Sequence, residues 1–170
     1  MGITDFTGIN WYYNREEYTT AYSYEIEQFE FKINKRGLIE SEAEYQRPIT
    51  VEAEMRSSEN TMTMTLFGDQ KLMFGSEFRN SGVTVYLHLT YWRLYLETNS
   101  WNKLEYFVET RPKWHKVRLE LDDLEEVKLY IDNELKYTGT SIKNKGKLSF
   151  IAVGSPMKIK NVKIGKQISV

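Results

Sequence analysis

Aromatic rings set among polar residues are the side chains of this sequence best suited to hold a ligand. Trp101 lies in the polar stretch 99–103 (NSWNK), where burial is harder to arrange than in a strand, so we expect an exposed ring that has a purpose. A second group occupies residues 91–95 (YWRLY). Such rings stack on the apolar C–H faces of sugars, while polar neighbours hydrogen-bond to the hydroxyl groups. The candidate ligand-binding residues are therefore Trp101, Trp92, Tyr91, Arg93 and Tyr95.

The scarcity of cysteine and histidine excludes several kinds of catalytic and metal site. The chain has no cysteine and two histidines, His88 and His115, so we expect neither thiol catalysis, disulfide bonds nor Cys/His zinc sites. A metal ion would need oxygen ligands, which suit calcium, and the acidic stretch 122–126 offers Asp122 and Asp123. That stretch lacks the alternating aspartates of a calcium loop. We expect a solvated turn and no cofactor, with calcium at these two aspartates as the alternative.

Charge and hydropathy argue against two classes of partner. The 170 residues include 23 Lys and Arg against 24 Asp and Glu, a net charge of -1, so we expect no nucleic-acid partner. Lysines near the C-terminus are better explained as protection of an edge strand against aggregation. The apolar runs are only a few residues long, so we expect neither a membrane span nor a secretory signal. The expectation is a soluble protein, cytoplasmic as given or extracellular if it is a processed domain.

The hydrophobic pattern that positions these residues is that of β-strands. In residues 49–56 (ITVEAEMR) every odd position is apolar and every even position is polar, which on a pleated strand places one face in the core and the other in water. The same alternation recurs in residues 61–66, 116–121 and 127–131. With weaker segments included, we expect about ten to twelve short strands. The length predicts a single domain over residues 1–170.

Short polar connections between these segments predict antiparallel pairing. Asp132 and Asn133 tolerate positive φ, as a two-residue hairpin turn requires. From residue 83 the odd positions are apolar, but beyond Trp92 the even ones are, so a bulge or hairpin turn near residues 91–93 must shift the phase. Because so many strands cannot form one flat sheet, we predict an all-β, two-sheet antiparallel β-sandwich, with a lipocalin-type barrel as the competitor.

The C-terminal third contains an ordered set of motifs that points to a known fold. It reads WHKVRLEL at 114–121, VKLYIDNEL at 127–135, GKLSF at 146–150 and MKIKNVKI at 157–164. This order resembles the concanavalin A-like lectin/glucanase superfamily, especially its laminin-G-like members. The resemblance implies a jelly roll rather than a barrel, and it specifies the fold more than an activity. One departure is Asn133, where the hairpin usually has Gly, and Asn adopts the left-handed conformation tolerably.

Residues 25–30 (EIEQFE) resemble the E-I-D-x-x-E signature of the glucanases in that superfamily. The resemblance implies a nucleophile and a general acid at Glu25 and Glu30, which face a sugar cleft from one bulged strand. Retaining hydrolysis needs two carboxyl groups about 5–5.5 Å apart, which one strand supplies only if a bulge returns Glu30 to the face of Glu25. The sequence departs from the signature at Glu27, where Asp is usual. The competing interpretation is a solvated strand face.

These observations favour non-catalytic carbohydrate binding, with an oligo- or polysaccharide held by aromatic rings and polar groups on a concave sheet or its loops. One alternative is a glycoside hydrolase or polysaccharide lyase of the glucanase type that uses Glu25 and Glu30. Another is a structural interaction module of an assembly, because the fold alone does not fix a function. The sequence names neither the sugar nor the oligomeric state.

Overall fold

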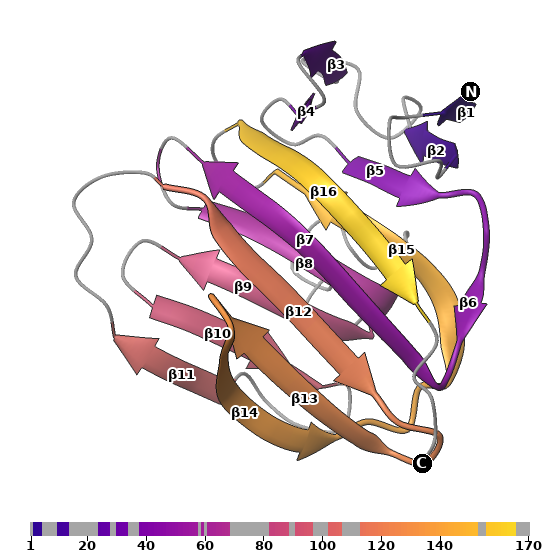
Figure 1. The fold of residues 1–170 in the computed structure, drawn as a ribbon, viewed down its shortest axis with the longest axis vertical. Coiled ribbons are helices and arrows are strands. Elements are labelled where there is room, and N and C mark those ends of the chain that lie inside the picture. The colour runs from indigo at the N-terminus through magenta and orange to yellow at the C-terminus, as the bar shows by residue number, and fades with distance from the viewer. Residues whose placement is uncertain are drawn as a thin grey trace.

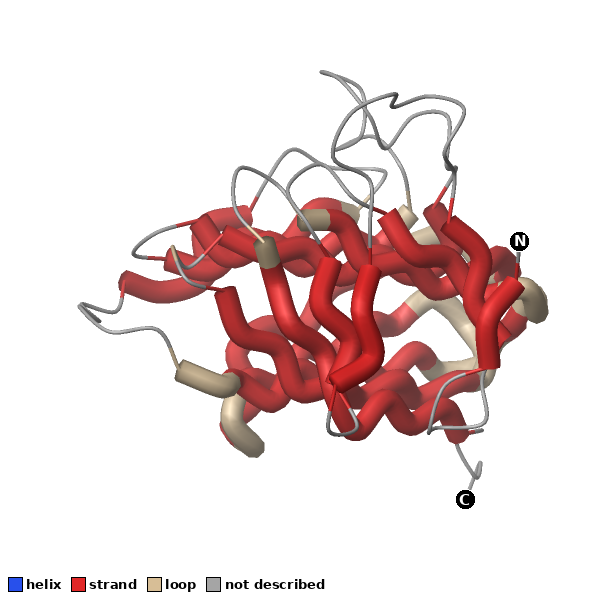
Figure 2. The backbone as a smooth tube through the Cα atoms, turned by 90° about the horizontal axis from the view of Figure 1, so that it is seen from above, coloured by secondary structure: helices blue, strands red, loops and turns tan. Residues whose placement is uncertain are grey.

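The computed structural model describes residues 2–4, 10–13, 24–27, 30–33, 38–57, 59, 61–68, 82–88, 91–96, 102–106, 113–152 and 156–165. In this part of the chain, sixteen β-strands form two antiparallel sheets (Figure 1). Figure 2 shows the sheets as two layers that lie face to face. Within the same residues there is no helix long and apolar enough to cross a membrane.

The two sheets differ in size and strand order. The larger sheet has nine strands, in the order β1 (Gly2–Thr4), β2 (Asn10–Tyr13), β5 (Leu38–Ser41), β15 (Lys145–Ile151), β8 (Thr61–Gly68), β9 (Val83–His88), β10 (Tyr91–Tyr95) and β11 (Asn102–Tyr106), with β6 (Tyr45–Gln46) also paired to β15. The smaller sheet has seven strands, in the order β14 (Glu134–Thr140), β13 (Glu126–Ile131), β12 (His115–Leu121), β7 (Ile49–Ser57), β16 (Met157–Gly165), β4 (Glu30–Ile33) and β3 (Tyr24–Glu27).

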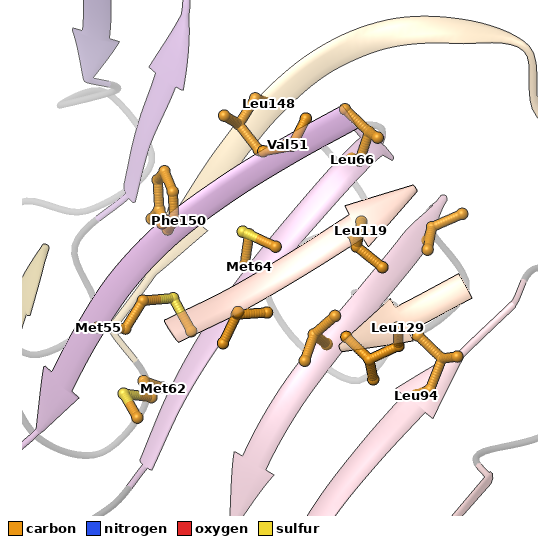
Figure 3. Close-up of a cluster of buried hydrophobic side chains, with 14 of the residues drawn as sticks. Val51, Met55, Met62, Met64, Leu66, Leu94, Leu119, Leu129, Leu148 and Phe150 are labelled. Carbon is orange, nitrogen blue, oxygen red and sulfur yellow. The ribbon is translucent and has the colours of Figure 1, made fainter. Parts of the chain in front are cut away.

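The core lies between the two sheets, and the two-residue alternation decides which side chains enter it. Every second residue of β7 from Ile49 to Met55 is buried, as the pattern predicts. Figure 3 shows Met55 of β7 in the same cluster as Met62 and Met64 of β8. Because two sheets share this core and each ends in its own edge strands, the predicted antiparallel sandwich is confirmed and the barrel alternative is wrong.

Two turn predictions are also confirmed. Asp132 and Asn133 join β13 to β14 with φ of 52° and 70°, the left-handed values that a two-residue hairpin turn needs. The phase shift near residues 91–93 has two sources: β9 and β10 form a hairpin that pairs His88 with Tyr91, and the register between β10 and β11 shifts between Trp92 and Arg93.

Candidate functional site

The middle of the nine-stranded sheet carries polar side chains on the face that points away from the core. On β8, Met62 and Met64 enter the core, so the alternating residues Thr63 and Thr65 face outward. The same alternation turns polar residues of β5, β15 and β9 outward. We call this set of six residues the polar face: Glu40, Thr63, Thr65, Thr84, Tyr86 and Ser149.

Strand register aligns the polar face in two rows. In one row, each residue is directly opposite the next across β5, β15, β8 and β9; in the other, two residues face each other across β8 and β9. Residues opposite each other in antiparallel strands have Cβ atoms about 4.5–5.5 Å apart, so side chains along a row lie within contact distance. The first row is Glu40, Ser149, Thr65 and Thr84, and the second is Thr63 and Tyr86.

The first row is held together by its own polar contacts. The hydroxyl oxygens of Thr65 and Thr84 are 3.1 Å apart, which makes a buried hydrogen bond. The Ser149 hydroxyl donates to the Glu40 carboxylate at 3.4 Å, and Nζ of Lys147 lies 3.7 Å from the other carboxylate oxygen. Because Lys147 balances the charge of Glu40, this buried carboxylate is retained without an isolated charge.

Thr63 is the exception on the polar face. It is completely buried, and its hydroxyl oxygen has no hydrogen-bond partner in the part of the chain that the structure describes. Leaving such a group unsatisfied costs roughly 1–3 kcal/mol of stability, and buried hydroxyls in folded proteins are rarely left so.

The outer face of the seven-stranded sheet is rich in charged residues, unlike the largely uncharged polar face of the other sheet. Its charged residues are partly exposed and pair with one another, for example Lys116 with Glu52 at 3.7 Å and Arg118 with Glu120 at 2.9 Å. The guanidinium of Arg118 also lies 4.1 Å from the centre of the Tyr130 ring. Such pairs on a solvated face need no ligand to explain them. On the described outer faces of the two sheets, the buried polar residues lie in the nine-stranded sheet.

Two of the predicted ligand-binding residues of β10 extend the two rows of the polar face by strand register. Arg93 is opposite Tyr86, and Tyr95 is opposite Thr84. Tyr91 is opposite His88 in a third row. These three residues therefore hold register positions on the polar side of the sheet, and their role in binding stays a prediction.

The two predicted tryptophans have different outcomes. Trp92 is opposite Leu87, which is buried in the core, so its register position belongs to the core side of the sheet. Trp101, the first candidate from the sequence, lies outside the described residues. The structure therefore places three of the five predicted ligand-binding residues beside the polar face.

The glutamates of the glucanase-like motif lie elsewhere, in the seven-stranded sheet. Glu25 is in β3 and Glu30 is in β4, an antiparallel pair at the edge of that sheet, where Glu25 is opposite Lys32 and Glu30 is opposite Glu27. The expectation of one bulged strand that carries both carboxylates is wrong for this chain, because the strand ends at Glu27 and a second strand begins at Glu30. The two residues are diagonal neighbours across a hairpin.

The acidic stretch that was the alternative calcium site is organised by hydrogen bonds within the chain. One carboxylate oxygen of Asp122 accepts the backbone N–H groups of Leu124 and Glu126, at 3.0 and 2.9 Å. Asp123 is exposed. In the part of the chain that the structure describes, no group of three or more His, Cys, Asp or Glu side chains is placed to hold a metal ion.

Sequence reasoning missed Thr63 and Arg47. The threonines of residues 61–65 were visible as the polar half of a strand, which predicts that they face outward but not that they are buried there. The Arg47 side chain is almost fully buried and donates hydrogen bonds to backbone carbonyls of two distant loops. No local pattern marks such a residue, because its partners lie 75 to 96 positions away in the sequence.

Comparison with solved structures places this fold among known ones. A candidate glycosyl hydrolase from Parabacteroides distasonis is 12% identical with a TM-score of 0.69, over 98% of each chain. The carbohydrate binding module CBM66 of Bacillus subtilis is 11% identical with a TM-score of 0.65, over 92% of this chain and 95% of that one. The carbohydrate recognition domain of Emp46p, in its metal-free form, is 15% identical with a TM-score of 0.59, over 94% and 89%.

These neighbours show the concanavalin A-like jelly roll, as the C-terminal motifs indicated. No protein-family model matches the chain, and no curated protein matches its sequence. The fold is shared by carbohydrate-binding modules, lectins and candidate glycosyl hydrolases, so at these identities it shows the architecture and leaves the activity to the chain's own residues.

Proposed function

Taking the concanavalin A-like fold as the premise, we propose that this chain binds an oligo- or polysaccharide on its polar face and does not cleave it. The ligand lies over β8, β9 and β10, where Tyr86 is partly buried beside Thr63, and Arg93 and Tyr95 continue the two rows. Two structural neighbours support this class of ligand, since one is named a carbohydrate binding module and another a carbohydrate recognition domain.

The residue types fit a sugar better than an apolar or a strongly charged ligand. A hydroxyl group both donates and accepts hydrogen bonds, so the Thr and Ser hydroxyls of the polar face match the hydroxyls of a sugar. Tyr86, Tyr91 and Tyr95 add rings that can stack on C–H faces of the ligand. Arg93 adds donors for ring or hydroxyl oxygens.

The observation that carries the proposal is the buried Thr63 hydroxyl that lacks a hydrogen-bond partner. A valine of the same shape would avoid the desolvation cost of that group. A threonine at this position is therefore best explained by a partner that arrives from outside the chain. A sugar hydroxyl supplies this partner, either directly or through one ordered water molecule.

The carboxylates argue for binding rather than hydrolysis. Most glycosidases need two carboxyl groups on either side of the scissile bond. Among the described side chains of the polar face, Glu40 is the single carboxylate, and Lys147 is its ion-pair partner. Glu25 and Glu30 are in the other sheet. The proposed function therefore assigns no catalytic residue.

Binding is tested by affinity electrophoresis in gels that contain one of a panel of neutral, amino and uronic acid polysaccharides. We expect retardation in at least one gel. Tyr86→Ala and Thr63→Val should each reduce it, by about tenfold in Kd for the tyrosine, because a stacked ring contributes about 1–1.5 kcal/mol. Thr138→Val, a change at an exposed threonine of β14, is the matched control and should leave retardation unchanged.

Three outcomes contradict the proposal. Retardation that survives both polar-face variants would place the sugar elsewhere on the molecule. Release of new reducing ends from a retarded polysaccharide, lost on Glu25→Gln, would favour the glycoside hydrolase alternative. A chain that is retarded by no polysaccharide is not a carbohydrate-binding protein of the proposed kind.

A further inference from the structure

A hollow lies where the β6–β7, β12–β13 and β14–β15 connections meet, away from the polar face. It has a volume of about 510 Å³, within the range of roughly 300–1,000 Å³ that is usual for small-molecule sites. We call it the loop depression. Its lining residues come from all three connections: Gln46, Arg47, Asp123, Leu124, Glu125, Ile142, Asn144 and Lys145.

Arg47 makes the loop depression a rigid feature. Its guanidinium donates to the carbonyls of Ser141 at 2.9 Å and Lys143 at 2.7 Å in the β14–β15 connection. It also donates to the carbonyls of Asp122 at 3.2 Å and Glu126 at 3.0 Å at the start of β13. One buried side chain thus ties three connections together. A site that is fixed before binding loses less entropy when a ligand arrives.

The other polar side chains of the loop depression have no such partners. Within the described part of the chain, no hydrogen bond or ion pair is made by the side chains of Asp123, Glu125, Gln46, Asn144 or Lys145. This contrasts with the paired charges on the outer face of the seven-stranded sheet. A preformed hollow ringed by carboxylates, amides and one ammonium group offers several donors and acceptors to a ligand.

The size of the loop depression and the charges of its lining indicate which class of ligand it could bind. A stable protein partner usually covers about 800 Å² of surface on each side, whereas the loop depression is a small local hollow. Its size therefore fits a small molecule better than a protein. Two carboxylates, Asp123 and Glu125, and one ammonium group, Lys145, remain to set the charge of the lining, because the guanidinium of Arg47 is balanced by Asp122, whose carboxylate oxygen lies 3.6 Å away. The remaining lining, Leu124 and Ile142, is apolar and 75% and 64% exposed. These two side chains suit the C–H face of a sugar ring, and the acidic excess disfavours an anion.

We propose that the loop depression is a second carbohydrate site, which takes one or two rings of a neutral or amino sugar and rejects uronic acids. This proposal rests on the proposed function, because it takes the ligand class from it. It adds a separate location and a charge preference. A chain with two sites holds a polysaccharide more tightly than either site does alone.

The experiment records backbone amide NMR spectra of the full chain during titration with three probes: a neutral gluco-oligosaccharide, a glucosamine oligomer and an oligogalacturonate. We expect the amides of residues 123–125 and 142–145 to shift with one or both of the first two probes and not with the oligogalacturonate. The double variant Asp123→Asn, Asn144→Ala should weaken that binding about tenfold, the loss expected for one or two hydrogen bonds. Glu59→Gln, at an exposed acid elsewhere, should change nothing.

The outcomes separate this inference from the proposed function. If the shifts are confined to the polar face, the second site does not exist and the proposed function stands. If the oligogalacturonate shifts the loop amides, the charge preference is wrong. If Thr63→Val abolishes the loop shifts, the two sites are not separate. If no sugar shifts any amide, both proposals fail.

Discussion

The carboxylate of Asp132 lies 2.9 Å from Nδ1 of His115, and this contact joins the turn of the β13–β14 hairpin to the first residue of β12. The second carboxylate oxygen accepts the backbone N–H of Lys116 at 2.9 Å. The backbone N–H of Asp132 in turn donates to the Lys116 carbonyl at 2.8 Å. One turn residue therefore fixes the start of a neighbouring strand as well as its own hairpin.

Removal of the Asp132 side chain should destabilise the fold without changing the turn. Asp132→Gly keeps the left-handed backbone, since glycine adopts a φ of 52° readily. It loses two hydrogen bonds to the carboxylate, one of them to a buried histidine, so we expect a loss of about 2 kcal/mol in the free energy of unfolding. Urea denaturation followed by tryptophan fluorescence measures it.

The adjacent turn residue provides the control for this prediction. Asn133 has a φ of 70°, is exposed, and occupies the position where related hairpins usually have glycine. Asn133→Gly should therefore change the stability by less than about 0.5 kcal/mol. Equal losses in the two variants would mean that the turn backbone, and not the carboxylate, is what matters.

Replacement of Arg47 by lysine should be far more damaging than a conservative change normally is. A lysine cannot reproduce the planar fork that reaches the carbonyls of Ser141 and Lys143 together with those at the start of β13. We expect Arg47→Lys to lower the free energy of unfolding by about 3 kcal/mol, because most of the guanidinium's hydrogen bonds to these carbonyls are lost. Arg56→Lys, on the exposed side of β7, is the control and should leave the stability almost unchanged. Thermal melts of the two variants measure the difference.

Arg47 also shows where prediction from the sequence stops. The sandwich and its core were predictable because the burial of residues 49–56 follows from a local two-residue alternation. The turn at Asp132 and Asn133 was predictable because their tolerance of positive φ is also local. Arg47 acts on loops that only the folded chain brings together, so its neighbourhood in the sequence contains no sign of its role.

The candidate site was predictable in part for the same reason. The aromatic residues of 91–95 predicted a binding strand, and Arg93 and Tyr95 hold register positions on the polar side, while their role in binding stays a prediction. The motif at residues 25–30 did not reveal that Glu25 lies in β3 and Glu30 in β4, because a hairpin cannot be told from a bulge by spacing alone. The burial of Thr63 depends on its neighbours in other strands, which the sequence does not reveal.

Gly82 should be intolerant of any side chain. Its φ is +62°, and a Cβ atom there would lie 2.5 Å from the carbonyl oxygen of Leu66, a backbone atom that cannot move aside. We expect Gly82→Ala to cost about 2 kcal/mol or more of stability, from backbone strain and overlap together. At Gly165 a Cβ would meet nothing within 4 Å, so Gly165→Ala is the control and should leave the melting temperature unchanged. A tolerated Gly82→Ala would disprove the close approach of β8 to the start of β9.

The two threonines at the centre of the polar face should respond oppositely to the same substitution. Thr63→Val removes a buried hydroxyl that has no partner, so the free protein should become more stable by about 1 kcal/mol while its affinity for sugar falls. Thr65→Val removes the hydroxyl that is hydrogen-bonded to the Thr84 hydroxyl. Because Thr84 then loses this hydrogen bond, the free energy of unfolding should fall by about 1 kcal/mol. The two changes are matched in size, strand and burial, and chemical denaturation with and without the polysaccharide measures both quantities. If Thr63→Val destabilised the free chain as much as Thr65→Val does, the Thr63 hydroxyl would already be satisfied, and it could no longer be the group that waits for a ligand.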